Sequence, residues 1–361
     1  MPEAIVLRKG YTTGTCAAAG AKAAAHALLG GKTPSSVEVT LPSGSHITIP
    51  VKSVIVSNGS ARAVIIKDAG DDPDVTNGAE FVAEVKVSGH NAVKPSVRIR
   101  GGEGVGVVTR PGLKVQPGRP AINPVPLKMI RAALLEAAKA HGSRAALIVT
   151  ISVPKGMELA ERTMNPRLGI TGGISILGTS GIVEPMSLAA YTHSISLGVN
   201  VALASGLTEV VFSTGRSSEK VAERELRLPE VGYVLTGDHM GYALRDVANR
   251  PGLKTVTVAG QFGKFTKLAA NHFETHCSDS SVEFNFLAEL CARFSASDTI
   301  VKKVIEANTA REVYLLLKEK GLQEVIDEVC RLVKKNSEKI AGKKVMAVLV
   351  GYENDLASIA R

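Results

Sequence analysis

Glycines beside polar residues mark four places between residues 178 and 263 of this 361-residue chain where a strand-like run stops. The four turns are Gly178-Thr179-Ser180-Gly181, Thr214-Gly215-Arg216, Thr236-Gly237-Asp238-His239 and Gly260-Gln261-Phe262-Gly263. Where parallel strands end, helix N-termini expose backbone N–H groups, and glycine lets a ligand approach the backbone closely. One such turn is common in any fold, but four on one sheet edge predict a binding pocket.

Missing phosphate-binding motifs limit what this pocket would hold. The sequence contains no GxxxxGK[ST], and no strand-like run is followed by GxGxxG; "GGEGVG" at 101–106 resembles the latter only weakly and is expected to form a flexible turn. A nucleoside without a phosphate fits better, with Glu184 or Asp238 accepting hydrogen bonds from its ribose hydroxyls. Each carboxylate could equally stabilise a helix N-terminus by ~0.3–1 kcal/mol. The residues expected to contact the cofactor are Gly178, Thr179, Ser180, Gly181, Glu184, Thr214, Gly215, Gly237 and Gly260.

Two clusters of potential metal ligands are weaker signals. In "HFETHC", His272 and His276 stand four residues apart beside Cys277, a spacing that can bind zinc, but no fourth ligand follows at a convincing distance. The aspartates of "KDAGDDPD" at 67–74 resemble a loop for a hard cation but lack the EF-hand spacing and its closing Glu. We expect a helix end at the first cluster, a turn at the second, and no bound metal.

Strands alternating with helices are expected to position the four turns. Strand, Gly-rich turn and helix follow one another four times from residue 174 to 272, which predicts a Rossmann-like, mostly parallel α/β sheet covered on both faces. The buried-strand run "RAALIVTISVP" opens this region, and a helical tail with a last strand-like "KVMAVLVGY" closes it. We therefore expect an α/β domain with a helical C-terminal extension over 144–361, and this domain would bind the cofactor.

Residues 1–143 mix strands, turns and two helices, which predicts an α+β domain that would bind the substrate. "SVEVTLPSGSHITIPV" predicts a hairpin, and two more strands flank the acidic turn. A long Pro- and Gly-rich loop precedes the helix "LKMIRAALLEAAKAHG". Near the start, "RKGYTTGTCAAAGAKAAAHALLGG" predicts an Ala-rich helix that is capped by Thr12, Thr13 and Thr15 and stopped by Gly30 and Gly31.

The net charge of +9, with a pI near 9.3, favours an anionic partner, although a basic surface kept for solubility would give the same balance. Nucleic acid is a poor fit because the Lys and Arg residues are dispersed, Trp is absent and aromatics make up only 4% of the chain. The longest apolar run, "AALIVTISV", is far shorter than the ~20 residues that span a bilayer. No apolar signal-peptide core is present, so a cytoplasmic protein without membrane contact is expected. The four cysteines lack CxxC spacing and are expected to be free thiols.

Five stretches together resemble one family. They are "GYTTGTCAAAGAKAA", "KDAGDDPDVTNG", "VTRPGL…PAINPVP", "ISVPKGMELAERTMNPRLGITGGISILGTSGIVEPMS" and "GKFTKLAANHFETHC". They are similar to the CbiD-type cobalt-precorrin-5B methyltransferases of anaerobic cobalamin biosynthesis. The resemblance implies transfer of a methyl group from S-adenosylmethionine to carbon 1 of the cobalt corrinoid substrate, which gives cobalt-precorrin-6A. One stretch, "AANHFETHC", departs from the family pattern, where a Gly and a Ser are expected, and this puts any role of Asn271 and Cys277 in doubt.

The resemblance also implies roles for basic and titratable residues. The corrinoid precursor carries many carboxylates, which a basic protein would bind. The residues expected at the substrate are Arg8, Lys9, Thr12, Thr13, Arg110 and Arg216. Arg8 and Lys9 would meet carboxylates, while the threonines would offer a helix N-terminus to an anion. Asp238 and His239 are the candidate pair for removing a proton during methyl transfer.

Two other functions compete with a methyltransferase. A nicotinamide-dependent oxidoreductase could use the same strand-end crevice, but its dinucleotide motif is missing. A non-catalytic tetrapyrrole-binding protein would suit the basic charge but not the nucleoside-like crevice. The sequence leaves open whether the chain forms a homo-oligomer.

Overall fold

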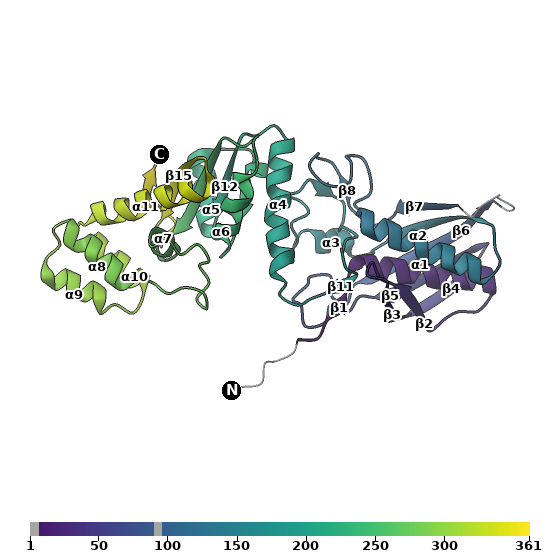
Figure 1. The fold of residues 1–361 in the computed structure, drawn as a ribbon. Helices are drawn as coiled ribbons and strands as arrows, with labels where there is room; N and C mark the ends of the chain where they lie inside the picture. The colour runs from purple at the N-terminus through teal and green to yellow at the C-terminus, as the bar shows by residue number, and fades with distance from the viewer. Residues whose placement is uncertain (1–6, 90–95) are drawn as a thin grey trace. The chain divides into compact units, whose positions relative to one another are not determined.

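The structure is a computed structural model that describes residues 7–89 and 96–361. The chain divides into two compact units, Met1–Ser187 and Leu188–Arg361. In Figure 1, the first unit holds the elements from β1 to β11 and the second those from α4 to β16.

The first unit is an α+β fold built on a five-stranded sheet with the strand order β4-β5-β6-β9-β7. Its strands pair antiparallel except β7, which runs parallel to β9. The elements of this unit are β1 (Gly10–Tyr11), α1 (Thr13–Gly30), β2 (Ser36–Thr40), β3 (His46–Pro50), β4 (Ser53–Ser57), β5 (Ser60–Ile66), β6 (Glu80–Gly89), β7 (Val97–Gly101), β8 (Val107–Val108), α2 (Pro124–Ala140), β9 (Ala146–Ser152), α3 (Gly156–Ala160), β10 (Ile170–Thr171) and β11 (Ile182–Val183). The expected hairpin is present as the antiparallel pair β2–β3.

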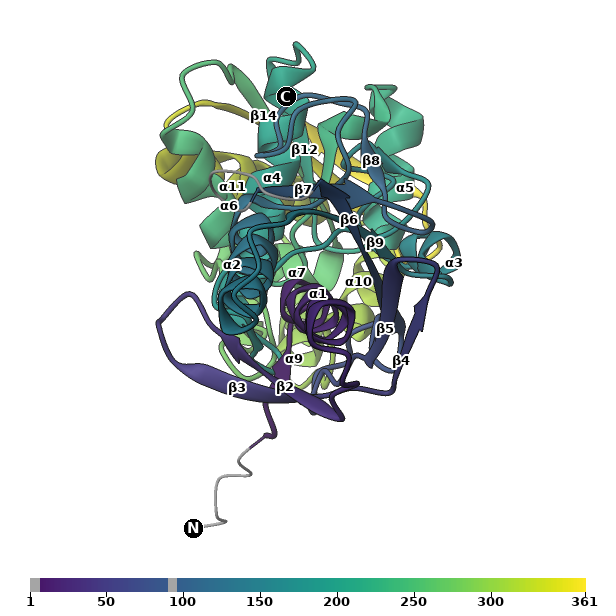
Figure 2. The ribbon, with the colours of Figure 1, turned by 90° about the vertical axis from the view of Figure 1, so that its right-hand side faces the viewer.

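Helix α1 is buried among the sheet, the β2–β3 hairpin and α2, as the end-on view in Figure 2 shows. Small residues permit this close packing, because a Cβ added to Gly20 would lie only 3.1 Å from the Cβ of Ala83 on β6. The predicted Thr12 cap and the stop at Gly31 are confirmed, whereas the Thr13 and Thr15 hydroxyls bond carbonyls outside the helix. The Thr12 side chain accepts a hydrogen bond from the Thr15 N–H, and Gly31 adopts a left-handed φ of 71° while its N–H bonds the Ala27 carbonyl.

The expected domain boundary between residues 143 and 144 differs from the division at Ser187 and Leu188. The run that was expected to open the α/β domain forms β9, which lies between β6 and β7 in the first sheet. Its alternate residues Leu147, Val149 and Ile151 are buried in the core of the first unit. An apolar run of this kind fits an antiparallel or a parallel sheet equally well, so the pattern alone did not assign it to a unit.

The second unit is an α/β fold whose five-stranded sheet has the order β13-β12-β14-β15-β16. The first four strands in that order pair in parallel, and β16 adds an antiparallel edge. The elements are α4 (Leu188–Ala204), β12 (Glu209–Ser213), α5 (Arg216–Leu226), the 3-10 turn η1 (Glu230–Gly232), β13 (Tyr233–Leu235), α6 (Met240–Ala248), β14 (Thr255–Gln261), α7 (Phe262–Ala269), α8 (Phe284–Arg293), α9 (Asp298–Ile305), α10 (Ala310–Glu319), α11 (Gln323–Ala341), β15 (Lys344–Val350) and β16 (Leu356–Ala360).

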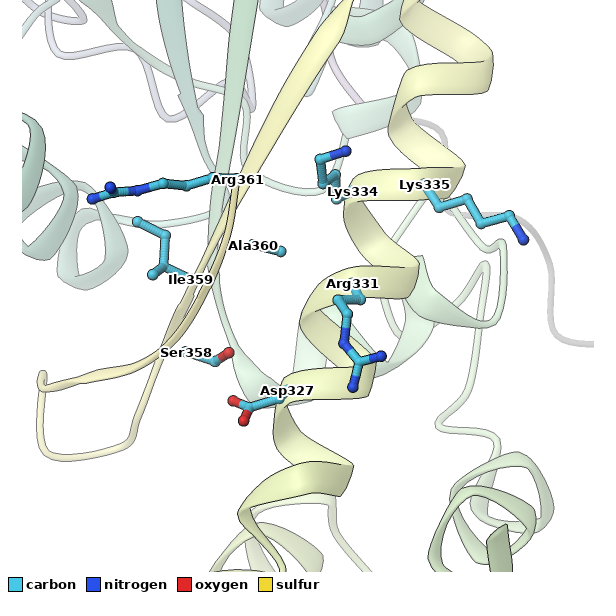
Figure 3. Close-up of a pocket in the computed structure, with 8 residues that line it drawn as sticks. All are labelled: Asp327, Arg331, Lys334, Lys335, Ser358, Ile359, Ala360 and Arg361. Carbon is cyan, nitrogen blue, oxygen red and sulfur yellow. The ribbon is translucent and has the colours of Figure 1, made fainter. Parts of the chain in front are cut away.

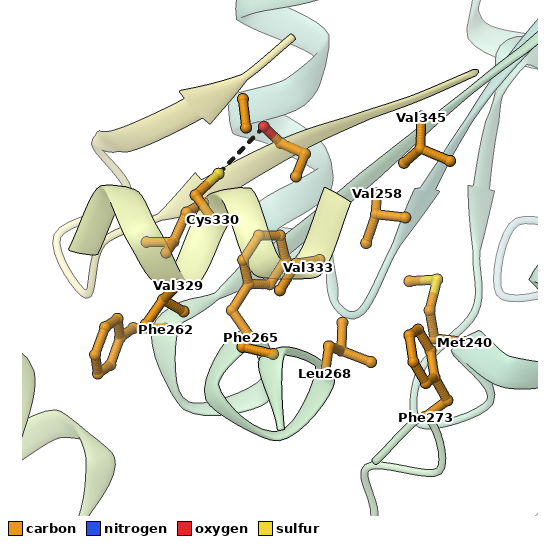
Figure 4. Close-up of a cluster of buried hydrophobic side chains, with 14 of the residues drawn as sticks. Met240, Val258, Phe262, Phe265, Leu268, Phe273, Val329, Cys330, Val333 and Val345 are labelled. Carbon is orange, nitrogen blue, oxygen red and sulfur yellow. Dashed lines mark hydrogen bonds between the residues drawn. The ribbon is translucent and has the colours of Figure 1, made fainter. Parts of the chain in front are cut away.

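Both faces of this sheet are covered. Helix α5 packs on one face through Val221 and Ala222, whereas α4, α6, α7 and α11 pack on the other. Figure 4 shows part of the larger core, where Cys330 donates a hydrogen bond of 3.4 Å from its Sγ to the Ala347 carbonyl. The other side chains labelled there are Met240, Val258, Phe262, Phe265, Leu268, Phe273, Val329, Val333 and Val345. The predicted combination of α+β and Rossmann-like α/β folds is confirmed.

Three of the four expected strand–turn–helix repeats are present as β12–α5, β13–α6 and β14–α7. The first expected repeat is wrong, because Ile174–Leu177 forms no strand of the parallel sheet and lies in the first unit. There, Ile174 and Ile176 are buried in the core that surrounds α1. The strand-like end of the tail is confirmed as β15, which pairs with β14.

All four cysteines are free thiols, as predicted. Burial raises the pKa of the Cys291 thiol to about 11 and that of Cys330 to about 11 as well. Within residues 7–89 and 96–361, no helix combines the length and the apolar character needed to cross a bilayer.

Candidate functional site

A cavity lies at the carboxyl ends of the parallel strands in the second unit. The chain passes from β12 outward to β13 and then returns to the other side of β12 as β14, so the strand order reverses between β12 and β14. Such a switch point opens a crevice beyond the strand ends. A cavity of about 620 Å³ occupies this place, within the ~300–1,000 Å³ range of small-molecule sites. It is lined by Thr214, Gly215, Arg216, Ser217, Ser218, Asp238, Gln261, Gly263, Lys264, Lys267, Thr275, His276, Cys277, Val282 and Tyr352.

The turn between β12 and α5 forms one wall. Gly215 is extended, with φ −175°, and a Cβ added to it would meet no atom within 4 Å, so the cavity reaches the backbone here. The Ser218 hydroxyl donates to the Gly215 carbonyl at 2.8 Å. Arg216 reaches Glu219 at 3.0 Å. Below this turn, the Ser213 Oγ is buried and finds no hydrogen-bond partner among the described residues.

Asp238 also lines the cavity. Its Oδ1 accepts a hydrogen bond of 2.8 Å from the Thr275 hydroxyl and lies 2.9 Å from the Lys264 ammonium, which also donates to the Thr214 carbonyl at 3.1 Å. Burial opposes ionisation of Asp238, but the bonds from Lys264 and Thr275 outweigh it and hold the pKa of this carboxyl below its usual value. No hydrogen bond from the described part of the chain ends on Oδ2. The carboxylate therefore keeps acceptor capacity for hydroxyl groups of a ligand.

His239 lies beside Asp238 but does not line the cavity. Its Nδ1 is 3.1 Å from Glu274 Oε2, and its ring packs edge-on against Tyr191 with centroids 5.2 Å apart. Glu274 also approaches Arg245 at 3.3 Å. These contacts make His239 part of the packing between α4, α6 and the segment after α7.

The segment 271–282 closes the cavity on the side of Asp238 and is held by several bonds. The Thr275 N–H donates to the Asp238 carbonyl at 3.0 Å, and the Ser280 hydroxyl donates to the Glu274 carbonyl at 2.8 Å. Lys267, which is only 8% exposed, donates from Nζ to the carbonyls of Thr275 and Ser280 at 2.9 and 2.7 Å. A wall fixed this firmly gives the cavity a defined shape.

The structure brings together only some of the residues that were predicted to contact the cofactor. Thr214 and Gly215 line the cavity, together with Arg216 and Asp238, which were assigned to other roles. Gly237 and Gly260 stand at the same strand ends but serve packing. A Cβ on Gly237 would lie 2.6 Å from the Tyr191 hydroxyl, and one on Gly260 would lie 2.7 Å from the Phe265 ring.

Gly178, Thr179, Ser180, Gly181 and Glu184 are not on this sheet edge, because they belong to the first unit. Gly178 has φ +132° and Gly181 has φ +85°, and a Cβ would overlap Thr12 at the first and Leu41, at 2.7 Å, at the second. Glycine is required at both positions for close packing around the start of α1. The expectation that all four turns share one sheet edge is therefore wrong.

The threonines at the start of α1 are bonded within the first unit. Thr12 and Thr13 are only 6% and 5% exposed. The Thr13 hydroxyl donates toward the carbonyls of Ser175 and Leu177 and accepts from the Leu177 N–H at 2.8 Å, while the Thr15 hydroxyl donates to the Gly181 carbonyl at 2.6 Å. The Gly14 N–H is also used, by the Leu177 carbonyl. The helix start therefore binds the chain's own turn, and its expected exposure to an anion is wrong.

The two basic residues before these threonines already have carboxylate partners. Arg8 forms a bidentate pair with Asp68 at 2.5 and 2.9 Å, and Lys9 lies 2.8 Å from Glu184. All four side chains are at least 40% exposed, so these pairs can open toward solvent and exchange partners. Arg110 differs, because its Nη1 is buried without a hydrogen-bond partner among the described residues.

The two potential metal clusters form other contacts. His272 lies 3.4 Å from Glu283, and His276 Nδ1 is 2.8 Å from the Ser278 hydroxyl. The acidic loop is tied to its own surroundings, because Asp74 binds the buried Lys67 at 2.6 Å and Asp71 accepts from the Arg8 N–H at 2.6 Å. Within the described ranges, no three His, Cys, Asp or Glu side chains come together as ligands.

Sequence reasoning missed several lining residues, chiefly Lys264, Lys267, Thr275 and Tyr352. The first three lie in "GKFTKLAANHFETHC", which was one of the stretches that carried the resemblance. A signal was present, because Lys264 and Lys267 are three residues apart and share one face of α7 at the end of β14. Tyr352 gave no such signal, since it reaches the cavity only after β15 joins the sheet.

A second hollow, of about 720 Å³, runs between α11 and the edge strand β16 (Figure 3). It is lined by Asp327, Arg331, Lys334, Lys335, Ser358, Ile359, Ala360 and Arg361. Arg331 and Lys334 pair with neighbouring glutamates on α11 at 2.7 and 2.9 Å. Basic residues along a sheet edge also discourage strand pairing between molecules, which explains them without a ligand.

Comparison with known proteins decides the family. The model of the family described as CbiD matches residues 2–185, and that of its C-terminal domain matches residues 274–358. This chain belongs to the CbiD family. A relative from Desulfotalea psychrophila named cobalt-precorrin-5B C(1)-methyltransferase is 43% identical, with 97% of each chain covered. A relative of the same name from Geobacillus kaustophilus is 45% identical over 90% of this chain and 86% of its own.

A solved structure described as a cobalamin biosynthesis protein (cbiD) from Archaeoglobus fulgidus is 28% identical, covers 87% of this chain and 85% of its own, and has a TM-score of 0.41. The family-model matches and the two relatives confirm, at the level of the family, the resemblance inferred from the five sequence stretches. The first family match, residues 2–185, ends close to the division between the two units.

Proposed function

We propose that this CbiD-family chain is a cobalt-precorrin-5B methyltransferase, which transfers a methyl group from S-adenosylmethionine to carbon 1 of the corrinoid and yields cobalt-precorrin-6A. Its near full-length identity with relatives of that name carries this proposal. The basic charge of +9 supports it, because the substrate presents many carboxylates.

The cofactor site in this proposal is the cavity of the second unit. Its size suits a nucleoside, the turn at Gly215 gives access to backbone, and Asp238 Oδ2 can accept from ribose hydroxyls. Bound S-adenosylmethionine supplies an electrophilic methyl group on its sulfonium. The residues that would hold it are Thr214, Gly215, Asp238, Lys264 and Thr275.

The substrate-binding surface is proposed on the first unit. Arg110 is the strongest candidate for a carboxylate contact, because its Nη1 lacks a partner in the described chain. Arg8 and Lys9 would release Asp68 and Glu184 when a substrate carboxylate arrives. Arg216 lines the cavity of the second unit and would offer a further positive charge to a substrate carboxylate.

Alignment is expected to supply most of the rate enhancement. Displacement at a sulfonium methyl requires the carbon nucleophile ~3–3.5 Å from the methyl group and in line with the leaving sulfur. The bonded wall around Asp238 and Thr275 suits that task, because it keeps the cavity in one shape. Asp238 is a weak proton acceptor while Lys264 and Thr275 lower its pKa.

The function is tested by incubating the purified chain with cobalt-precorrin-5B and S-adenosylmethionine carrying a labelled methyl group. The expected result is a product whose mass rises by one labelled methyl. Cofactor binding is tested separately by titrating S-adenosylhomocysteine and NAD. Binding of NAD in place of S-adenosylhomocysteine would favour an oxidoreductase, and corrinoid binding with neither nucleotide would favour a tetrapyrrole carrier.

The role of Asp238 and His239 is tested by Asp238→Asn and His239→Gln in single-turnover methylation. A true general base would lose roughly 10²–10⁴-fold in turnover with little change in ligand binding. Since Asp238 is bonded to Lys264 and His239 to Glu274, we expect losses smaller than this range. A loss within the range for either variant would establish that residue as the base.

A further inference from the structure

Lys267 is a buried cation in the wall of the cavity of the second unit. It is 8% exposed and lines the cavity from α7. An ammonium group has three N–H donors. Two of them reach the carbonyls of Thr275 and Ser280, and the third has no partner in the described part of the chain. Carbonyl dipoles orient the ammonium but do not neutralise its charge.

The other cations of the cavity are compensated. Arg216 pairs with Glu219 at 3.0 Å, and Lys264 pairs with Asp238 at 2.9 Å. Asp238 is the one carboxylate among the lining residues, and no ion pair joins Lys267 to any acidic side chain within residues 7–89 and 96–361. A buried charge without an opposite charge is costly, unless a ligand provides the partner.

We infer that Lys267 binds the carboxylate of the amino-acid half of the cofactor. The inference rests on the proposed function, which supplies a ligand with such a carboxylate. The cofactor is a better source than the corrinoid, because the buried Lys267 lies in a cavity of about 620 Å³ that suits a nucleoside rather than a macrocycle. The two carbonyl bonds fix the ammonium in place, so little side-chain freedom is lost when the carboxylate binds.

The test compares two ligands that differ only in this group: S-adenosylhomocysteine and its decarboxylated analogue. The measured quantity is the ratio of their dissociation constants by calorimetry. The wild-type protein should prefer S-adenosylhomocysteine by about 10- to 100-fold, the range of a charge-assisted hydrogen bond. Lys267→Gln can still donate to the loop carbonyls but carries no charge, so its preference should fall to a few-fold at most.

Lys335→Gln is the matched control, since it removes a lysine charge from α11 in the same unit, outside the cavity. It should keep the wild-type preference. Equal binding of the two ligands by the wild type, or an unchanged preference in Lys267→Gln, would overturn the inference. If Lys267→Gln weakens only corrinoid binding, the carboxylate comes from the substrate and the assignment to the cofactor is wrong.

A wild-type measurement covers the case in which Lys267→Gln does not fold. In protein labelled with ¹³C at lysine Cε, the Lys267 chemical shift should change more on binding of S-adenosylhomocysteine than on binding of the decarboxylated analogue. No difference would overturn the inference. The two proposals fail separately: absence of methylation and of S-adenosylhomocysteine binding counts against the function, whereas normal methylation with no preference for the carboxylate counts against Lys267 alone.

Discussion

Glycine-rich turns that look alike in the sequence do opposite things in the two units. In the first unit, the turn at Gly178 to Gly181 closes onto the start of α1, and the hydroxyls of Thr13 and Thr15 bond its backbone. In the second unit, the turn at Gly215 stands open to a cavity, with no atom within 4 Å of an added Cβ. The comparison shows that a glycine beside polar residues indicates close approach but does not tell what approaches.

The charged groups near the two glycine turns follow the same division. Around α1 in the first unit, Asp68, Asp74 and Glu184 each have a basic partner. At the sheet edge of the second unit, Lys267 lacks an ion pair among the described residues. A buried charge without a partner destabilises the folded state. Such a charge is therefore expected where a bound ligand supplies the missing partner.

The largest predicted effect comes from breaking the buried pair of the first unit. The Lys67 side chain is 0% exposed and lies 2.6 Å from Asp74. Asp74→Asn leaves this ammonium buried without a charge partner and should lower the free energy of unfolding by about 3–5 kcal/mol in urea titration. The double variant Lys67→Met with Asp74→Asn should recover most of the loss. A double variant as unstable as the single one would show that the charge is not the cause.

The same pair predicts a pH dependence. Burial opposes ionisation of Asp74, but Lys67 and Thr76 outweigh it and hold the pKa of Asp74 below its usual value. A lowered folded-state pKa contributes stability above the ordinary value of ~4, and this contribution is lost as the pH falls through the lowered value. As the pH is lowered below about 4, the urea midpoint of the wild type should therefore decrease more steeply than that of Asp74→Asn.

The second-largest predicted effect distinguishes Gly178 in the first unit from Gly215 in the second. Gly178→Ala places a Cβ against Thr12 at a φ of +132° and should cost about 2–4 kcal/mol of unfolding free energy. Gly215→Ala meets no atom and should change stability by less than about 0.5 kcal/mol. The added methyl group would enter the cavity and overpack it, so the affinity for S-adenosylhomocysteine should fall about tenfold. Unchanged binding by a folded Gly215→Ala would place the cofactor elsewhere.

Local patterns predicted much of this molecule. The Ala-rich helix with its Thr12 cap, the β2–β3 hairpin and three strand–turn–helix repeats follow from residue types and periods that act over a few neighbours. The assignment of β9 to a sheet could not be predicted, because the choice depends on its pairing with β6 and β7. Thr214, Gly215 and Asp238 were found because strand ends gather at a sheet edge. Tyr352 was missed because it reaches that edge only through the order of the strands.

The smallest predicted effect concerns the surface pair of the first unit. Lys9 and Glu184 are 62% and 63% exposed, and the bond from Lys9 lowers the pKa of Glu184 without burying it. Solvent screens such a pair, so Glu184→Gln should leave the unfolding midpoint unchanged within error. S-adenosylhomocysteine affinity should also stay the same if the cofactor binds at the edge of the second sheet. A tenfold loss of that affinity would return the segment from Gly178 to Glu184 to the cofactor site, and the contrast between a closed and an open glycine turn would then fail as a guide to function.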